Sequence, residues 1–301
     1  MFHSFKEIEE YVLAQNIKKR IVLANAQDAY ALRAVVKARR TGAVEGTLIG
    51  KREELTAMLR DMGEREEDYE IIDFSGEELE SARLAMRLVR EGKADIPMKG
   101  LMQTSSFARA ILDRKDGLLP ESGRRLLSQC CFLEYKDRIL MVTDAAINIA
   151  PDVETQIGIV ENTLPVAKAL GIEQPKVAVL SAVEKISEKM SSTVTAAEIT
   201  RRGVKGCVIS GPLALDGAIS MEAAQHKSIC DPVAGQADIL LVPFIEIGDV
   251  LYKTCVYIAG MTMASTICGT TSPVVINSRT DTPDTKYYSI LIAVLRCIKG
   301  N

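Results

Sequence analysis

The sequence contains no tryptophan, only two histidines and an odd number of cysteines, seven in 301 residues. The cysteines are scattered and none forms a C-x-x-C pair, and a chain of this length can bury a large core without disulfides. We therefore interpret them as reduced, mostly buried side chains. His3 and His226 lie far apart, and no His/Cys cluster has the spacing of zinc ligands, so no metal site is expected.

The sequence also has no large excess of positive or negative residues. Lys and Arg number 37 against 40 Asp and Glu, and this near balance provides no positive field for a nucleic acid or an anionic membrane. No stretch reaches the roughly 18 uninterrupted apolar residues of a membrane span, and residues 1–15 carry charges where a signal peptide has its apolar region. With 47% hydrophobic and 26% charged residues, the composition indicates a cytoplasmic globular protein.

Apolar residues follow two alternating periods from residue 20 onward. Short runs rich in β-branched residues predict strands, and segments with apolar residues three and four apart predict helices. The expected strands cover residues 18–26, 44–50, 69–74, 175–182, 206–210, 237–243 and 272–278. The expected helices cover residues 28–40, 51–63, 152–170, 193–202, 220–227 and 284–298, with further helices capped by Ser75 and beginning near residue 248. Residues 126–142 instead predict an antiparallel hairpin that turns at Lys136 and Asp137.

Repeated β-α units predict an α/β protein with mainly parallel sheets. The length favours about two domains at the usual prior of roughly 150 residues per domain. No linker rich in proline, glycine or serine divides the chain, so two domains would have to be closely joined.

Common catalytic and nucleotide-binding motifs are missing. The nearest approach to a Walker A loop, residues 46–52, is one residue too short between its glycines and ends in Arg52 instead of Ser or Thr. No G-x-G-x-x-G follows a strand, and no G-x-S-x-G elbow is present. A P-loop nucleotidase, a Rossmann-type NAD enzyme and a serine hydrolase are therefore disfavoured.

Four polar loops follow predicted strands, and open α/β sheets bind ligands beyond the carboxyl ends of their strands. These loops are residues 98–105, 143–148, 210–216 and 277–281. In the first, Lys99 supplies a cation, Gly100 allows close backbone approach, and Thr104 or Ser105 caps a helix expected to begin near Phe107. A phosphate or carboxylate would fit this loop, but an ordinary capped junction with a solvated lysine explains the same residues.

The fourth loop carries Ser278, Arg279, Asp281 and Asp284 ahead of a predicted helix. A hydroxyl, a guanidinium and a carboxylate at a helix N-terminus can hold a doubly charged oxyanion while a carboxylate removes a proton. A helix cap with a surface Arg–Asp pair is the alternative interpretation.

The remaining loops offer single polar groups able to orient a substrate. These are Asp144, Asn148, Gly211, Asp216 and Glu246. Each of them is also typical of an ordinary turn or helix cap.

Several separate blocks, in order along the whole chain, resemble the phosphate acetyltransferase/butyryltransferase family. They are residues 98–101 with Thr104, 140–144, 205–208 with 211–216, 223–227, 237–239 with Gly248 and 250–253, and 272–275 with Ser278 and Arg279. The resemblance implies two α/β domains around a cleft, similar to isocitrate and isopropylmalate dehydrogenases, usually as homodimers. Residues 1–133 plus 279–301 are then expected to form the first domain and 134–278 the second, with the active site in the cleft between them.

The implied reaction moves a short acyl group, preferably butyryl, reversibly between coenzyme A and inorganic phosphate. Coenzyme A is then a substrate, and neither a cofactor nor a metal is required. Ser278 and Arg279 match the family's Ser-Arg pair. Members of the butyryl branch carry an Asp at the place of Asp281, which we expect to be the base, with Asp284 as the other candidate. Lys253 lies in a matching Leu-Tyr-Lys block and is an expected substrate-binding residue.

Three positions depart from the butyryl branch: Gln129, Ser210 and Asp249 stand where His, Asp and Asn are common. They bear on the acyl-chain preference more than on the reaction class. Because no activated nucleophile has a partner base, we expect direct transfer in a ternary complex of enzyme, acyl-CoA and phosphate.

Three alternatives to this function stay open. One is a phosphate acetyltransferase that acts mainly on acetyl-CoA. Another is an NAD(P)-linked dehydrogenase of the same architecture, although the sequence shows no cluster of metal-binding aspartates. The third is a non-catalytic protein that binds CoA or acyl phosphate.

Overall fold

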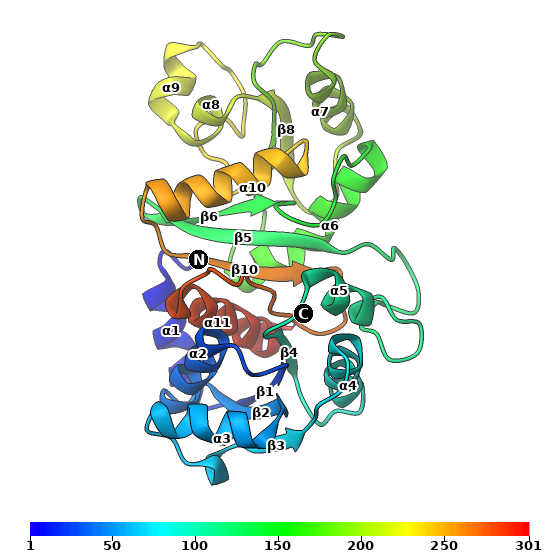
Figure 1. Ribbon diagram of the computed structural model, residues 1–301. Helices are drawn as coiled ribbons and strands as arrows, with labels where there is room; N and C mark the ends of the chain where they lie inside the picture. Colours follow the sequence, from blue (N-terminus) through cyan, green and yellow to red (C-terminus); the bar gives the residue numbers. More distant parts are fainter. Residues whose placement is uncertain (301) are drawn as a thin grey trace. The chain divides into compact units, whose positions relative to one another are not determined.

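The structure is a computed structural model that describes residues 1–300 (Figure 1). The chain divides into two compact units. The central unit contains Met1–Ser4 and Leu126–Met263, and the terminal unit contains Phe5–Arg125 and the residues from Ala264 onward. The divisions at 125/126 and 263/264 differ from those expected at 133/134 and 278/279. The first differs because the 126–142 hairpin stays whole within the central unit.

The terminal unit contains a parallel four-stranded sheet in the order β3-β2-β1-β4. The strands are β1 (Lys19–Ala24), β2 (Val44–Gly50), β3 (Glu70–Asp73) and β4 (Ile96–Lys99). Ile21, Val22 and Leu23 in β1 are completely buried, as expected of a central parallel strand covered on both faces. The sequence locates β1, β2 and β3 correctly, each within the range expected for it.

Helices connect these strands. They are α1 (Phe5–Ala14), α2 (Ala29–Arg40), α3 (Arg52–Asp61), η1 (Glu66–Asp68), α4 (Glu78–Arg90), α5 (Thr104–Ile111) and α11 (Pro283–Lys299). The Asp28 carboxylate caps α2 by accepting from the backbone N–H groups of Tyr30 and Ala31, as its sequence position predicts. The expected cap at Ser75 is wrong, because α4 begins after Glu77, whose side chain makes no capping bond.

Residues 272–278 do not form the continuous strand expected of them. Only isolated bridges occur there, from Val275 to Met98 and from Val274 to Ile267. The strand that forms instead is β10 (Met263–Cys268), which is buried along its length. Val275 nevertheless lies beside β4, because its carbonyl accepts from the N–H of Lys99 at 3.0 Å. The loop of residues 277–281 thereby follows a chain segment at the carboxyl end of β4.

The other sheet has six strands in the order β10-β5-β6-β9-β7-β8. The remaining strands are β5 (Ser128–Tyr135), β6 (Arg138–Thr143), β7 (Lys176–Leu180), β8 (Val208–Leu213) and β9 (Ile239–Leu241). The β5–β6 pair is the predicted antiparallel hairpin, turning at Lys136 and Asp137, whereas β6–β9, β9–β7 and β7–β8 are parallel. The expected α/β class with mainly parallel sheets is therefore confirmed.

The helices of the central unit follow its strands (Figure 1). They are α6 (Val153–Ala169), α7 (Ser191–Arg202), α8 (Leu215–Ile219), α9 (Met221–His226) and α10 (Ile245–Lys253), which a π-helical turn, η2 (Thr254–Ile258), prolongs. No helix in the described part of the chain has both the length and the apolar character needed to cross a membrane.

Candidate functional site

The loops at the carboxyl ends of β1 and β4 lie together in the terminal unit. The N–H of Gly100 donates to the Ala24 carbonyl at 2.9 Å, and that of Leu101 donates to the Asn25 carbonyl at 2.8 Å. Charged side chains from these loops, from residues 278–281 and from α11 act on one another electrostatically. We call this group the charge cluster, and it comprises Asp28, Lys99, Arg279, Asp281 and Lys286.

Lys99 is the buried cation at the end of β4, with only 5% of its surface exposed. Within residues 1–300, its Nζ donates only to the carbonyl oxygens of Gly100 and Met102, each at 3.4 Å. Burial, and then the nearby charge of Lys286, lower the pKa of Lys99 to about 8. A solvated surface lysine is therefore the wrong description of this residue.

Lys286 is a second buried cation, on the first turns of α11, and is 2% exposed. Its Nζ donates to the backbone carbonyl of Ser278. Burial lowers the pKa of Lys286, although the carboxylates of Asp281 and Asp28 oppose that shift. The cluster therefore contains two ammonium groups that are largely removed from water.

Residues 278–281 form a tight turn around the Asp281 carboxylate. Oδ2 of Asp281 accepts from the N–H of Ser278 at 2.8 Å, and the Asp281 side chain is buried. Ser278 and Arg279 are exposed, and the Ser278 hydroxyl lies 3.1 Å from that of Thr280. The turn therefore presents a hydroxyl and a guanidinium outward and holds the carboxylate inside.

Asp284 lies apart from this cluster. Its carboxylate forms an ion pair with Lys37 at 2.8 Å, and its side chain is 64% exposed. The charge of Asp281, in contrast, opposes the lowering of the pKa of both Lys99 and Lys286. The structure thus separates the two acids that sequence reasoning left as alternative bases.

Gly100 lies in a close backbone contact, as expected, whereas Thr104 lies inside a helix that it was expected to cap. A Cβ at Gly100 would meet the Asn25 carbonyl oxygen at 2.2 Å, so the close approach that this glycine permits is to the chain itself. The cap expected at Thr104 or Ser105 is wrong, because α5 already begins at Thr104 and the Glu78 carboxylate accepts from the N–H of Gln103.

In the central unit, Asp144 organises its own loop. The buried carboxylate accepts from the backbone N–H groups of Gln129, Ala146, Ile147 and Asn148, and also from the Asn148 side chain at 2.5 Å. Burial, which outweighs these bonds, raises the pKa of Asp144. Because the protein itself supplies so many donors, Asp144 and Asn148 shape this loop.

The side chains of three other expected binding residues are exposed. Two of them form ion pairs with a nearby residue. Asp216 in α8 pairs with Lys227 at 2.8 Å. Lys253 pairs with Asp249 one turn earlier in α10, also at 2.8 Å, and Glu246 lies exposed in the first turn of that helix.

The expected site at Gly211 is a packing contact. A Cβ there would meet the Val179 carbonyl oxygen of β7 at 2.5 Å, so only glycine fits. The three residues that differ from the butyryl branch each have a partner within the chain. The Ser210 hydroxyl donates to Asp231, and Asp249 forms an ion pair with Lys253. The backbone N–H of Gln129 donates to Asp144.

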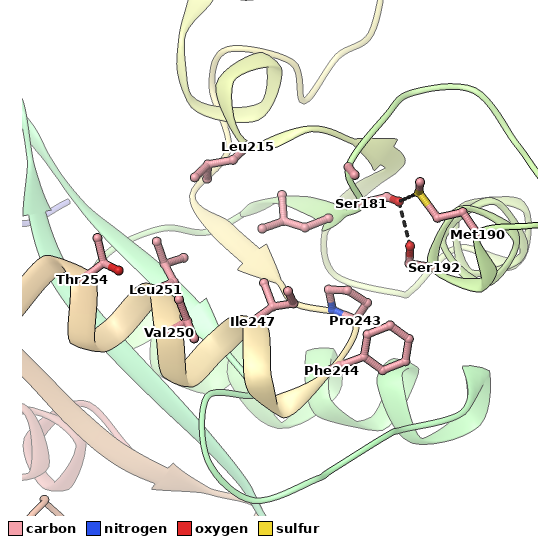
Figure 2. Close-up of a pocket in the computed structure, with 12 residues that line it drawn as sticks. Ser181, Met190, Ser192, Leu215, Pro243, Phe244, Ile247, Val250, Leu251 and Thr254 are labelled. Atoms are coloured by element: carbon pink, nitrogen blue, oxygen red, sulfur yellow. Dashed lines mark hydrogen bonds between the residues drawn. The ribbon is translucent and has the colours of Figure 1, made fainter.

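An apolar pocket of about 490 Å³ lies in the central unit (Figure 2). Figure 2 shows α10 forming one side of it through Ile247, Val250 and Leu251. The polar groups lining it are few and uncharged, such as the hydroxyls of Ser181 and Ser192, which lie 2.8 Å apart. The pocket is therefore suited to apolar groups and supplies no charge for a phosphate.

Sequence reasoning missed both Lys286 and Asp28 as members of the charge cluster. The sequence does contain a sign that Lys286 is buried. This lysine stands eight residues after Ser278 and shortly before the uninterrupted apolar segment 290–295. A charged residue on a helix face that points toward the core is a candidate functional group, because lysine is almost never buried without a reason.

The chain matches the family model described as Phosphate acetyl/butaryl transferase over residues 78–294. It is 42% identical to a phosphate butyryltransferase of Clostridium acetobutylicum, with all of both chains covered. It is 37% identical to a phosphate acetyltransferase of Thermotoga maritima, with 94% of this chain and 97% of the relative covered.

Solved structures of other proteins are also similar to this chain. A branched-chain phosphotransacylase from Enterococcus faecalis V583 superposes with a TM-score of 0.83 at 33% identity, covering 92% of this chain and 98% of the other. A 4-hydroxythreonine-4-phosphate dehydrogenase from Klebsiella pneumoniae, at 12% identity and a TM-score of 0.56, with 92% and 98% covered, shares the fold alone.

Proposed function

Because the chain belongs to the phosphate acetyl/butyryl transferase family, we propose that it transfers a short acyl group, butyryl preferred, reversibly between coenzyme A and inorganic phosphate. The observation that carries this function is the charge cluster. Lys99 and Lys286 are buried, and Arg279 is exposed beside them in the same cluster. A compact, doubly charged oxyanion fits such a group of cations.

In the direction of acyl phosphate formation, a phosphate oxygen attacks the thioester carbonyl carbon. The carbon–sulfur bond breaks, and CoA leaves as a thiolate that takes up a proton. Arg279 holds the phosphate through its fork of N–H donors, and the Ser278 hydroxyl donates to the developing oxyanion or the thiolate. In the reverse direction the CoA thiol loses its proton and attacks the carbonyl carbon of the acyl phosphate, the carbon–oxygen bond to phosphate breaks, and inorganic phosphate leaves.

Asp281 is the base for that thiol proton. Its Oδ2 is occupied by the Ser278 N–H, while Oδ1 accepts no hydrogen bond within residues 1–300. Asp284 is a poorer candidate because Lys37 neutralises it at the surface. A carboxylate within reach of the thiol would accept its proton as a general base.

The transfer is direct, with both substrates bound at once. An acyl-enzyme needs an activated nucleophile, and burial raises the pKa of the Cys207 and Cys297 thiols to about 11, which disfavours these two side chains in that role. Proximity of the two bound substrates then supplies much of the rate acceleration. Acyl label retained on the protein after incubation with butyryl-CoA alone would refute direct transfer.

The proposed partners are a short acyl-CoA, inorganic phosphate and a second copy of the chain, in the cytoplasm, with coenzyme A as a substrate and no metal. A patch of exposed apolar residues along α10 and η2 supports the homodimer: Val250 is 61% exposed, Tyr257 60% and Ile258 82%. Exposed apolar residues gathered on one helix indicate an interaction surface.

A panel of acyl-CoAs from two to six carbons tests this function. Each is incubated with phosphate, and release of the CoA thiol is measured. We expect turnover that is fastest with four-carbon chains and within about two hundred-fold for chains one methylene longer or shorter. Preference for acetyl-CoA would identify an acetyltransferase, and no release with any member would leave a non-catalytic binding protein.

A further inference from the structure

Two lysines of the charge cluster are buried, and neither forms an ion pair with the nearby carboxylates of Asp28 and Asp281. Lys99 is 5% exposed and Lys286 is 2% exposed, and neither Nζ forms an ion pair within 4.0 Å in the part of the chain that the structure describes. Buried charges in proteins are normally paired, because desolvation of an isolated ion costs free energy. This pair therefore lacks its anion.

Both ammonium groups also retain unused donors. An ammonium carries three N–H donors, and Lys286 uses one on the carbonyl of Ser278. Lys99 makes only two contacts of 3.4 Å, which are longer than ordinary hydrogen bonds. Each lysine can therefore donate to a further acceptor.

The charged groups that face Lys99 come from three elements. Lys286 comes from α11, Asp28 from the start of α2, and Arg279 and Asp281 from the 278–281 turn. Both carboxylates are already engaged, since Oδ1 of Asp28 accepts from two backbone N–H groups of α2 and Oδ2 of Asp281 holds the turn. The charge cluster thus contains three cations and two carboxylates, so its net charge is positive.

We propose that Lys99 and Lys286 together bind one phosphate dianion, and that the dianion binds only when both lysines are protonated. This inference rests on the proposed function, which names inorganic phosphate as a substrate. Lys286 is also a positioning residue, because its bond to the Ser278 carbonyl anchors the turn that carries Arg279.

The coupling to protons follows from the environment of Lys99. Since its pKa lies at about 8 in the free protein, Lys99 loses its proton at mildly alkaline pH. A bound dianion favours the charged form and raises that pKa. Anion binding therefore takes up a proton near and above this pH, and the affinity falls by about tenfold per pH unit there.

Inorganic sulfate is the appropriate probe, because it remains a dianion across this range whereas phosphate itself titrates. Sulfate binding to the full chain is measured by calorimetry from about pH 6.5 to about pH 9.5, in two buffers with different heats of ionisation. We expect proton uptake and the loss of affinity above about pH 8. An affinity that is flat over this range, without proton uptake, would overturn the proposal.

Lys286→Met tests the pair directly. We expect sulfate affinity at pH 7 to fall at least about tenfold and the midpoint of the pH dependence to move upward, because the like charge that depresses the pKa of Lys99 is gone. Lys286→Arg should restore most of the affinity. A structural defect alone would weaken binding without moving the midpoint, so unchanged affinity or an unchanged midpoint contradicts the pairing.

The matched control is Lys93→Met, whose lysine pairs with Glu91 at the surface and should leave sulfate binding unchanged. If Lys286→Met does not fold, the wild-type titration decides alone. Proton-coupled sulfate binding without any acyl transfer would refute the proposed function and keep the anion site. Acyl transfer with pH-independent sulfate binding would refute the anion site only.

Discussion

At the scale of single residues, exposed side chains at the site differ in role from buried ones. Ser278 and Arg279 are exposed, whereas Lys99, Asp281 and Lys286 are buried and supply most of the charge of the site. The backbone turn joins the two sets, because Asp281 binds the Ser278 N–H and Lys286 binds the Ser278 carbonyl. Substitutions at these positions should therefore have different effects.

Asp281→Asn should lower kcat for acyl-CoA formation by about 10²–10⁴-fold while changing KM for the acyl phosphate little. The amide oxygen still accepts from the Ser278 N–H, so the turn is kept while the base is lost. Steady-state kinetics with butyryl phosphate and CoA measure both constants. Asp284→Asn, which removes only a surface partner of Lys37, serves as the control, and an equal loss in that variant would assign the base to Asp284.

Lys99→Met should stabilise the protein at pH 7 while weakening anion binding. The folded state depresses the pKa of Lys99 from 10.5 to about 8, so the protonated lysine destabilises the fold at pH values below 8, and this penalty declines as the pH rises from 8 toward 10.5. The protonated Lys99 lowers the free energy of unfolding by at most about 3 kcal/mol. Thermal melts of the variant and the wild type at pH 7 and pH 10 should show a gain that shrinks at the higher pH; a loss of stability at pH 7 would contradict this.

At the scale of elements, the ends of β1 and β4 set the position of the site. Gly100 lets the two loops exchange hydrogen bonds, because any side chain there would meet the carbonyl oxygens of Asn25 and Ala24 at 2.2 and 2.5 Å. The approach of these backbones fixes where Lys99 lies relative to Asp28.

Gly100→Ala should destabilise the protein by about 1–3 kcal/mol, because β4 and β1 must separate to admit the methyl group. Urea unfolding measures the change. Gly92→Ala, at the C-terminal end of α4, meets nothing within 4 Å but lies at a φ of +69°, and gives the cost of backbone strain alone. A smaller loss at Gly100 than at Gly92 would show that the loops tolerate the methyl group.

Sequence periodicity located several of the buried strands and helices because its signal is local. Asp28 before α2 and the apolar run of β1 are readable within a few residues. The replacement of the strand expected at 272–278 by β10 was not predictable in this way, because bridges such as Val275 to Met98 join residues distant in sequence. Lys286 was missed for the same reason, since its burial and its Ser278 contact depend on how α11 packs.

At the scale of the whole molecule, the chemistry is divided between two units. The terminal unit holds the charge cluster, and the central unit holds the apolar pocket beside α10 (Figure 2). The exposed apolar patch on α10 and η2 belongs to the central unit as well. The charge cluster therefore belongs to one unit of the chain, and the apolar pocket and the exposed apolar patch belong to the other.

Ile258→Glu should convert the proposed homodimer to a monomer. Ile258 is 82% exposed, so the substitution leaves the fold of one copy intact and places a charge in the proposed interface. Light scattering after gel filtration gives the mass directly. Ile17→Glu, at an exposed position of the terminal unit, is the control, and a dimer that survives Ile258→Glu would place the interface elsewhere.

The most direct test measures initial rates of butyryl-CoA formation over a grid of butyryl phosphate and CoA concentrations, for the wild type and for Arg279→Ala. We predict intersecting double-reciprocal lines, which indicate that both substrates are bound together, and a loss of about 10²-fold or more in the variant, the scale expected when one charge-stabilising donor is removed. Parallel lines, or a variant that turns over as fast as the wild type, would contradict a guanidinium-held phosphate that exchanges its acyl group directly with coenzyme A.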